Sequence, residues 1–124
     1  MKYESLEPVT HEQADAVARG GDTHALSRIA VSIALADDDL DWSTAFLLSL
    51  ARHENANVRG NALLGFGHLA RRFRAIANTA SVAAAITAGL ADADAFVRGQ
   101  ADAAADDFQH FIGPLASFDG APSI

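Results

Sequence analysis

The sequence predicts an all-helical protein made of paired helices, and three observations carry that prediction. Half of the residues are hydrophobic but only 7% are aromatic, and much of the hydrophobic share is alanine, which favours helices. Valine, isoleucine and threonine do not alternate with polar residues as they would in strands. The stretch 51–73, ARHENANVRGNALLGFGHLARRF, has a weaker copy at 90–112, 39 positions later. A period of about 40 residues with helical spacing inside it is typical of stacked two-helix repeats.

The first expected helix pair covers residues 10–36. Thr10 and Gln13 form a capping-box pattern, which predicts a short helix over about 11–19 that a Gly-Gly pair then ends. Asp22 is a good N-cap for a second helix that continues to the end of the pair. The hydrophobic residues of that helix follow the i, i+3, i+4, i+7 spacing of a buried stripe: Leu26, Ile29, Ala30 and Ile33.

The second expected pair covers residues 41–74. Asp41 is placed to cap a helix over Trp42–Arg52, which is apolar nearly all round and is therefore expected to lie centrally. Asn57 can cap a longer helix that continues to about Arg74. The inward stripe of this longer helix is expected to contain Val58, Ala62, Phe66, Leu69 and Phe73.

The third expected pair covers residues 79–112. Its first helix is alanine-rich, ends near Gly89, and has three candidate starting residues: Asn78, Thr79 and Ser81. Asp94 or its neighbour is expected to start the last helix, which a Gly-Pro pair ends at 113–114. The buried residues of this helix are expected to be Val97, Ala101, Ala105, Phe108 and Ile112.

Together these elements predict a single domain over residues 1–124. A lone helix pair cannot bury its apolar face, whereas three stacked pairs share one continuous core. Residues 1–9 are expected to form an extended arm, and residues 113–124 a loosely ordered tail in which Leu115 and Phe118 could dock.

The composition also restricts where the protein works and what it carries. The chain has no cysteine, which excludes disulfides and suits a reducing compartment. Its first residues contain no apolar signal segment, and no apolar run approaches the length of a membrane span. We therefore expect a soluble cytoplasmic protein that does not enter a membrane.

The charge is distributed unevenly along the chain, with a net value of −7. Residues 1–41 hold three cationic side chains and nine anionic ones, residues 42–74 hold five arginines and one glutamate, and residues 75–124 hold one arginine and six aspartates. Nucleic-acid binding needs a broad basic face, so we expect none. The run Arg71-Arg72-Arg74 is better explained as a complement to a helix C-terminus. An acidic surface instead attracts a basic protein partner.

The repeat itself resembles the HEAT-repeat family, whose pattern is approximately Leu-x-Asp-x-Asp-x-x-Val-Arg-x-x-Ala. The last copy matches it at every position: Leu90, Asp92, Asp94, Val97, Arg98 and Ala101. The central copy keeps Val58, Arg59 and Ala62. The resemblance implies a short right-handed α-α superhelix that acts as a protein-interaction scaffold, with the second helix of each pair lining a concave face. It also implies that Arg59, Arg98, Asp92 and Asp94 are structural, forming a ladder between repeats.

No pattern in the sequence predicts catalysis, a cofactor or a metal site. His53-Glu54 resembles the pairs of deoxyhypusine hydroxylase, a HEAT-repeat metalloenzyme, but one pair supplies too few ligands. The remaining histidines fall on four different expected helices, without an HExxH spacing: His11, His24, His68 and His110. There is no nucleophile elbow, P-loop or dinucleotide fingerprint either.

Two groups of residues are candidates for partner binding. A stripe beside the core on the two long helices mixes polar groups with an aromatic one, as recognition surfaces do; it contains Asn61, His68 and Arg72, with Gln100, Asp107 and Phe111 at the repeat offset. Acidic clusters form the second group, where mutual repulsion favours a cationic partner: Asp37, Asp38, Asp39 and Asp41, with Asp102, Asp106 and Asp107. The alternatives are an ordinary solvated face for the stripe and simple helix capping for the first cluster.

These features predict a non-catalytic protein-binding module. A compact acidic domain without an active site resembles the immunity proteins, or antitoxins, that neutralise basic cytotoxic nucleases. Electrostatic attraction would then make association fast. The alternatives are a general HEAT-repeat scaffold or regulatory subunit and, less favoured, a metalloenzyme.

Overall fold

The computed structural model describes residues 9–118 and is all-helical over that range, with no strand. The prediction of an all-α fold is therefore confirmed. The helices are α1 (His11–Gly20), α2 (Thr23–Ala36), α3 (Leu40–Leu50), α4 (Ala56–Phe73), α5 (Thr79–Leu90) and α6 (Ala95–Phe111), followed by a short 3-10 helix, η1 (Leu115–Ser117).

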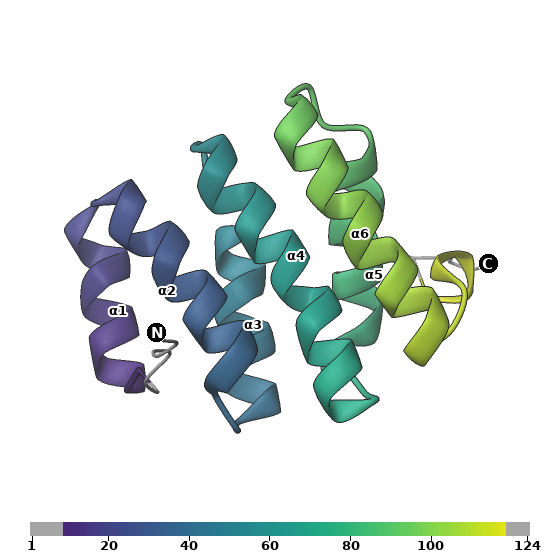
Figure 1. Ribbon diagram of the computed structural model, residues 1–124, viewed down its shortest axis with the longest axis horizontal. Helices are drawn as coiled ribbons and strands as arrows, with labels where there is room; N and C mark the ends of the chain where they lie inside the picture. The colour runs from purple at the N-terminus through teal and green to yellow at the C-terminus, as the bar shows by residue number, and fades with distance from the viewer. Residues whose placement is uncertain (1–8, 119–124) are drawn as a thin grey trace, which may run out of the picture.

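The helices form two layers (Figure 1). The second helices of the three expected pairs, α2, α4 and α6, lie side by side in one layer, and α3 and α5 lie behind them. The centre of the fold is α4, which packs against α2, α3, α5 and α6. The prediction that the apolar helix after Asp41, here α3, lies at the centre of the fold is therefore wrong. Ala45 and Ser49 on α3 are exposed, and such small side chains leave little apolar surface in water.

Local capping signals place most helix ends. The Thr10–Gln13 capping box is present in full, and Gly21 ends α1 in the left-handed region at φ 80°. Asp22 caps α2 through a 3.1 Å hydrogen bond from the Ala25 N–H. Asp94 likewise caps α6. These predictions are confirmed.

Two predicted caps were wrong by two residues. Asp39, not Asp41, caps α3 by accepting the Trp42 N–H at 3.0 Å. Asn55, not Asn57, caps α4 by accepting a 3.1 Å hydrogen bond from a backbone N–H one turn later. In both places several side chains of capping type stand close together, and only the backbone path decides which one can reach the third N–H of the helix.

The start of α5 follows a different pattern. The residue before it, Asn78, is left-handed at φ 50° and makes no side-chain capping hydrogen bond. The hydroxyl group of the next residue, Thr79, donates a 3.3 Å hydrogen bond to the Ile76 carbonyl. Of the three candidate starting residues, Thr79 is the first residue of α5.

A continuous hydrophobic core runs between the two layers. Phe66 of α4 and Phe108 of α6 are its largest fully buried side chains. Most of the expected inward residues are buried, whereas Ile29, Phe73 and Ile112 pack against the core from its edge and are only partly buried.

Glycines let α4 approach its neighbours closely. A Cβ built on Gly65 would lie 2.8 Å from a Leu47 methyl group, and one on Gly67 would lie 3.2 Å from the Ala104 Cα. These distances are shorter than or at the limit of van der Waals contact, so larger residues would push α4 away from α3 and α6.

One glycine has no such packing reason. Gly99 lies inside α6, is exposed, and has no atom within 4 Å of the position that a Cβ would occupy. Gly99→Ala is expected to raise the free energy of unfolding by about 0.5–1 kcal/mol, because it reduces the entropy lost on helix formation. Urea denaturation measures this change. Gly89→Ala is the contrasting variant and should destabilise, because its Cβ would lie 2.5 Å from Leu63 Cδ1.

An ion pair links the second helix pair, α3–α4, to the third, α5–α6. Arg59 donates to both carboxylate oxygens of Asp92, at 2.9 and 2.8 Å, and to the carbonyls of His53 and Glu54, each at 3.1 Å. The corresponding Arg98 donates to two carbonyls, those of Asp92 and Ala93. The expectation that these arginines are structural agrees with these bonds.

Asp92 also organises its own turn. It accepts the backbone N–H of Asp94 at 2.9 Å. The Arg59 guanidinium and this N–H together hold the pKa of Asp92 below its usual value.

The described part of the chain after α6, residues 112–118, packs back against the core. Leu115 and Phe118 pack against the core, and the Phe118 ring meets that of Phe108 edge-on at 5.8 Å between centroids. The docking that the sequence allowed for these two residues is therefore present, because their apolar side chains are removed from water. Most of the expected N-terminal arm (1–8) and the end of the tail (119–124) lie outside the described residues.

An aromatic stack joins the first repeat to the second. The His11 ring lies parallel to that of Trp42 at 3.6 Å, and Trp42 in turn stacks on Phe46.

No helix within residues 9–118 is long and apolar enough to cross a lipid bilayer.

Candidate protein-binding surface

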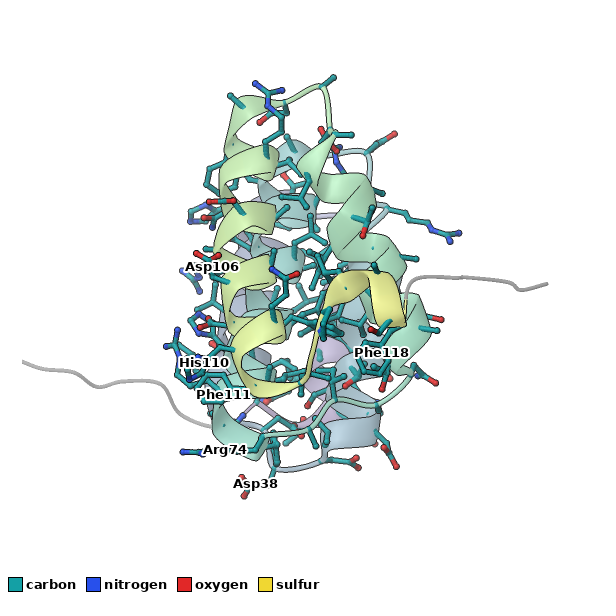
Figure 2. All side chains as sticks on the ribbon, turned by 90° about the vertical axis from the view of Figure 1, so that its right-hand side faces the viewer. Asp38, Arg74, Asp106, His110, Phe111 and Phe118 are labelled. Atoms are coloured by element: carbon teal, nitrogen blue, oxygen red, sulfur yellow. The ribbon has the colours of Figure 1, made fainter. Side chains whose placement is uncertain are left out.

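The outward side of the layer formed by α2, α4 and α6, here called the second-helix face, brings together many of the predicted partner-binding residues. His68 and Arg72 reach it from α4, and Asp107 and Phe111 from α6. Figure 2 shows Asp106, His110, Phe111 and Arg74 on this side of the molecule, with Phe118 on the opposite side. Four of the six residues of the predicted stripe, His68, Arg72, Asp107 and Phe111, therefore lie near one another toward the C-terminal ends of α4 and α6.

Ion pairs and a hydrogen bond connect α4 with α6, with α2 and with the loop after α2, near the C-terminal ends of these helices. Arg71 of α4 contacts Asp107 of α6 at 2.7 Å. Arg72 donates to the Ala34 carbonyl of α2 at 2.9 Å and lies 3.4 Å from a carboxylate oxygen of Asp38. We call this region, formed by Asp38, Arg71, Arg72, Arg74, Asp107 and Phe111, the mixed-charge corner. Arg72 and Asp107 thus hold the surface together as well as lining it.

Phe111 lies within the mixed-charge corner, in contact with Arg74. The Arg74 guanidinium lies 5.3 Å from the centre of the Phe111 ring, and His110 meets that ring edge-on at 4.5 Å. The last described aromatic residue of the tail, Phe118, docks on Phe108. A half-buried aromatic ring beside an arginine is a common element of protein interfaces.

The acidic residues of the loop between α2 and α3 have separate roles. Asp37 accepts hydrogen bonds from the Ser43 hydroxyl and the Asp39 N–H, and its carboxylate lies 3.0 Å from His11 Nε2. With its side chain only 9% exposed, it serves the fold. Asp39 is the cap of α3. Asp38, at 98% exposure, and the exposed Asp41 remain available to a partner.

The acidic residues of α6 are also divided. Asp102 and Asp106 are exposed, whereas Asp107 is half-buried beside Arg71. Asp106 points to the second-helix face (Figure 2). Asp38, Asp102 and Asp106 are thus exposed members of the predicted acidic clusters, as is Asp41.

The remaining two predicted residues lie toward the N-terminal ends of the helices. Asn61 lines a hollow between α2 and α4. Gln100 lies against Gly60, where Phe96 also packs. Phe96 is 43% exposed, and the sequence analysis missed it. Its position one residue before the buried Val97 was the available signal, because a large apolar residue beside an inward one must lie at the edge of the core.

His68 is the residue of this face whose titration is most affected by its surroundings. Burial, and then the nearby Arg71 and Arg72, lower its pKa, while Asp107 opposes the shift. The folded protein therefore resists protonation of His68. As the pH falls below about 6.5, the unfolded chain binds the proton first and stability decreases.

We expect His68→Gln to remove this part of the pH dependence. The difference in unfolding free energy between pH 7.5 and pH 5.5 should become smaller in the variant than in the wild type, because glutamine does not titrate. Urea denaturation at both pH values measures it. An equal difference in the two proteins would contradict the attribution of this pH dependence to His68. The control variant is His24→Gln, on the exposed surface of α2.

The His53-Glu54 pair forms part of a turn. His53 Nδ1 accepts the Asn55 N–H at 3.0 Å, and both carbonyls of the pair accept from Arg59. Over residues 9–118, no three histidine or acidic side chains lie close enough together to hold a metal ion.

Comparison with known proteins was made at the level of sequence and of structure. No protein-family model matches the chain, and no curated protein matches it. A chain in the crystal structure of a CDI (contact-dependent inhibition) complex from Cupriavidus taiwanensis LMG 19424 is similar to it, with a TM-score of 0.70 and 27% sequence identity. The match covers 90% of this chain and 98% of that one.

Proposed function

We propose that this protein is an immunity protein, which binds a toxin and neutralises it without catalysing a reaction. The observation that carries the proposal is the likeness, over nearly the whole length of both chains, to a component of a contact-dependent inhibition complex. Such a complex pairs a toxin with the protein that neutralises it.

The charge favours the inhibitor over the toxin. A nuclease-type toxin needs a basic groove to hold phosphates, whereas this chain has a net charge of −7. The mixed-charge corner contains exposed Asp38 and an aromatic ring, and Asp102 and Asp106 add further exposed negative charge on α6. We propose that the partner is a basic toxin domain, that the second-helix face contacts it, and that the complex forms in the cytoplasm.

We propose further that the fold is a short HEAT-like superhelix. Three helix pairs follow one another with their second helices side by side. The Arg59–Asp92 ion pair, which connects successive pairs, is the kind of ladder that the family resemblance implies. Such a fold presents a preformed surface, so binding orders little of the chain and loses little entropy.

Co-expression in a bacterial host tests the proposed function. A candidate basic toxin domain from the same genome is placed under an inducible promoter, with and without the protein. Induction of the toxin alone should stop growth, and co-expression should restore it and yield a complex that elutes as one peak in size-exclusion chromatography. Absence of both rescue and complex would overturn the proposal.

A further inference from the structure

A hollow of about 630 Å³ lies between the N-terminal halves of α2 and α4. From α2 it is lined by Thr23, His24, Ser27 and Arg28, and from α4 chiefly by Asn57 and Asn61. The predicted partner-binding residue Asn61 therefore belongs to a concave site with its own chemistry.

The hollow is rich in hydrogen-bond donors and contains no acidic lining residue. Arg28 provides a fixed positive charge, and the amide groups of Asn57 and Asn61 provide two N–H donors each. Asp22 and Glu54 stand close in sequence but do not line it; the Asp22 carboxylate accepts from the backbone of α2. In a protein with a net charge of −7, this is a locally positive recess.

The helices themselves add to this local charge. Both α2 and α4 begin beside the hollow, at Thr23 and Ala56, so their unpaired N–H groups and the positive ends of their dipoles lie near it.

A buried hydroxyl in the wall points independently to a ligand. Ser27 is only 8% exposed, yet its Oγ has no hydrogen-bond partner among the described residues. A buried polar group without a partner is unfavourable. The oxygen is shielded from solvent in this structure, so the Ser27 side chain has to rotate before a ligand oxygen in the hollow can accept this hydroxyl's hydrogen.

We propose that the hollow binds a carboxylate. Its single fixed positive charge, on Arg28, balances the single negative charge of a carboxylate, and the planar guanidinium and amide groups match that group's geometry. Resting on the proposed function, we assign the carboxylate to an aspartate or glutamate of the toxin. A negative side chain on a basic partner meeting a positive recess on an acidic one would fix the orientation of the two proteins.

The first test uses the protein alone and small ligands. Addition of acetate or glutarate at constant ionic strength should shift the side-chain amide signals of Asn57 and Asn61 in ¹H–¹⁵N spectra in a saturable way, and chloride should not. Arg28→Gln and Ser27→Ala should each weaken this binding at least threefold. Arg52→Gln, an exposed arginine outside the hollow, is the matched control.

The second test uses the complex. Asn61→Asp puts a negative charge into the hollow and should raise the Kd for the toxin at least tenfold. Gln13→Glu makes the same chemical change on exposed α1 and keeps the capping box, so it should bind as the wild type does. Circular dichroism confirms that both variants fold.

The outcomes separate the two proposals. Loss of toxin binding in Asn61→Asp supports the toxin as the source of the carboxylate, and saturable acetate shifts with unchanged toxin binding support a free carboxylic acid instead. A toxin that binds normally to all hollow variants, together with absent acetate shifts, would overturn the inference and leave the proposed function intact. If no toxin binds the wild type, the proposed function fails while the acetate titration still tests the hollow.

Discussion

Replacement of Arg59 by alanine is expected to lower the free energy of unfolding by about 2–3 kcal/mol, which is a large fraction of the stability of a small domain. The guanidinium makes a two-oxygen contact with Asp92 and hydrogen bonds to two carbonyls. The side chains of Arg59 and Asp92 are only 20% and 18% exposed, so the variant leaves a carboxylate and two carbonyls poorly solvated. Urea denaturation at neutral pH measures the loss.

Arg98→Ala is the matched control, because Arg98 occupies the same place one repeat later. It is exposed and donates to two carbonyls, and within residues 9–118 it makes no hydrogen bond to a carboxylate. We expect a loss of about 1 kcal/mol or less. Equal losses in the two variants would show that the link between repeats contributes little.

The pH dependence provides a second measurement of the same contact. The pKa of Asp92 is held low in the folded protein, first by Arg59. This group therefore contributes stability that is present above about pH 4, the value of an unfolded aspartate, and is lost as the pH falls through the lower folded value. Asp92→Asn should lose stability at neutral pH and show a weaker further loss on acidification.

Neutralisation of the exposed acidic residues is expected to slow association with the toxin at least tenfold at low salt. The variant carries Asp38→Asn, Asp102→Asn and Asp106→Asn, which are exposed; Asp37, Asp39 and Asp107 are left intact because they serve the fold. Long-range attraction raises association rates by 10- to 1,000-fold, and this change removes part of it. Stopped-flow mixing at low ionic strength measures the rate.

A second triple variant separates position from net charge. Glu12→Gln, Asp15→Asn and Glu54→Gln remove the same number of charges from exposed sites on α1 and the turn before α4. It should associate faster than the first variant, and the two rates should converge at high salt, where the charges are screened. Equal rates at low salt would show that only the net charge matters and would contradict a role for the second-helix face.

Much of the candidate surface could be predicted from the sequence, because helical spacing and the repeat offset place residues on a common face. His68 and Phe111 are examples, since each follows from counting turns from a buried valine. Arg71, Arg74 and the unpaired hydroxyl of Ser27 were missed. Their contacts join different helices, and the spacing within one helix does not determine how far a neighbouring helix is shifted along its axis.

The sequence alone determined the all-helical class, the helix boundaries to within about two residues and the pairing of the helices. These features depend on capping groups, hydrophobic periodicity and a repeat, all of which act over short distances along the chain. The tertiary structure decided that α4 is central, that Asp37 is internal, and that α2 and α4 leave a positive hollow between them. Those outcomes depend on side chains far apart in the sequence, whose separation is set only when the helices pack.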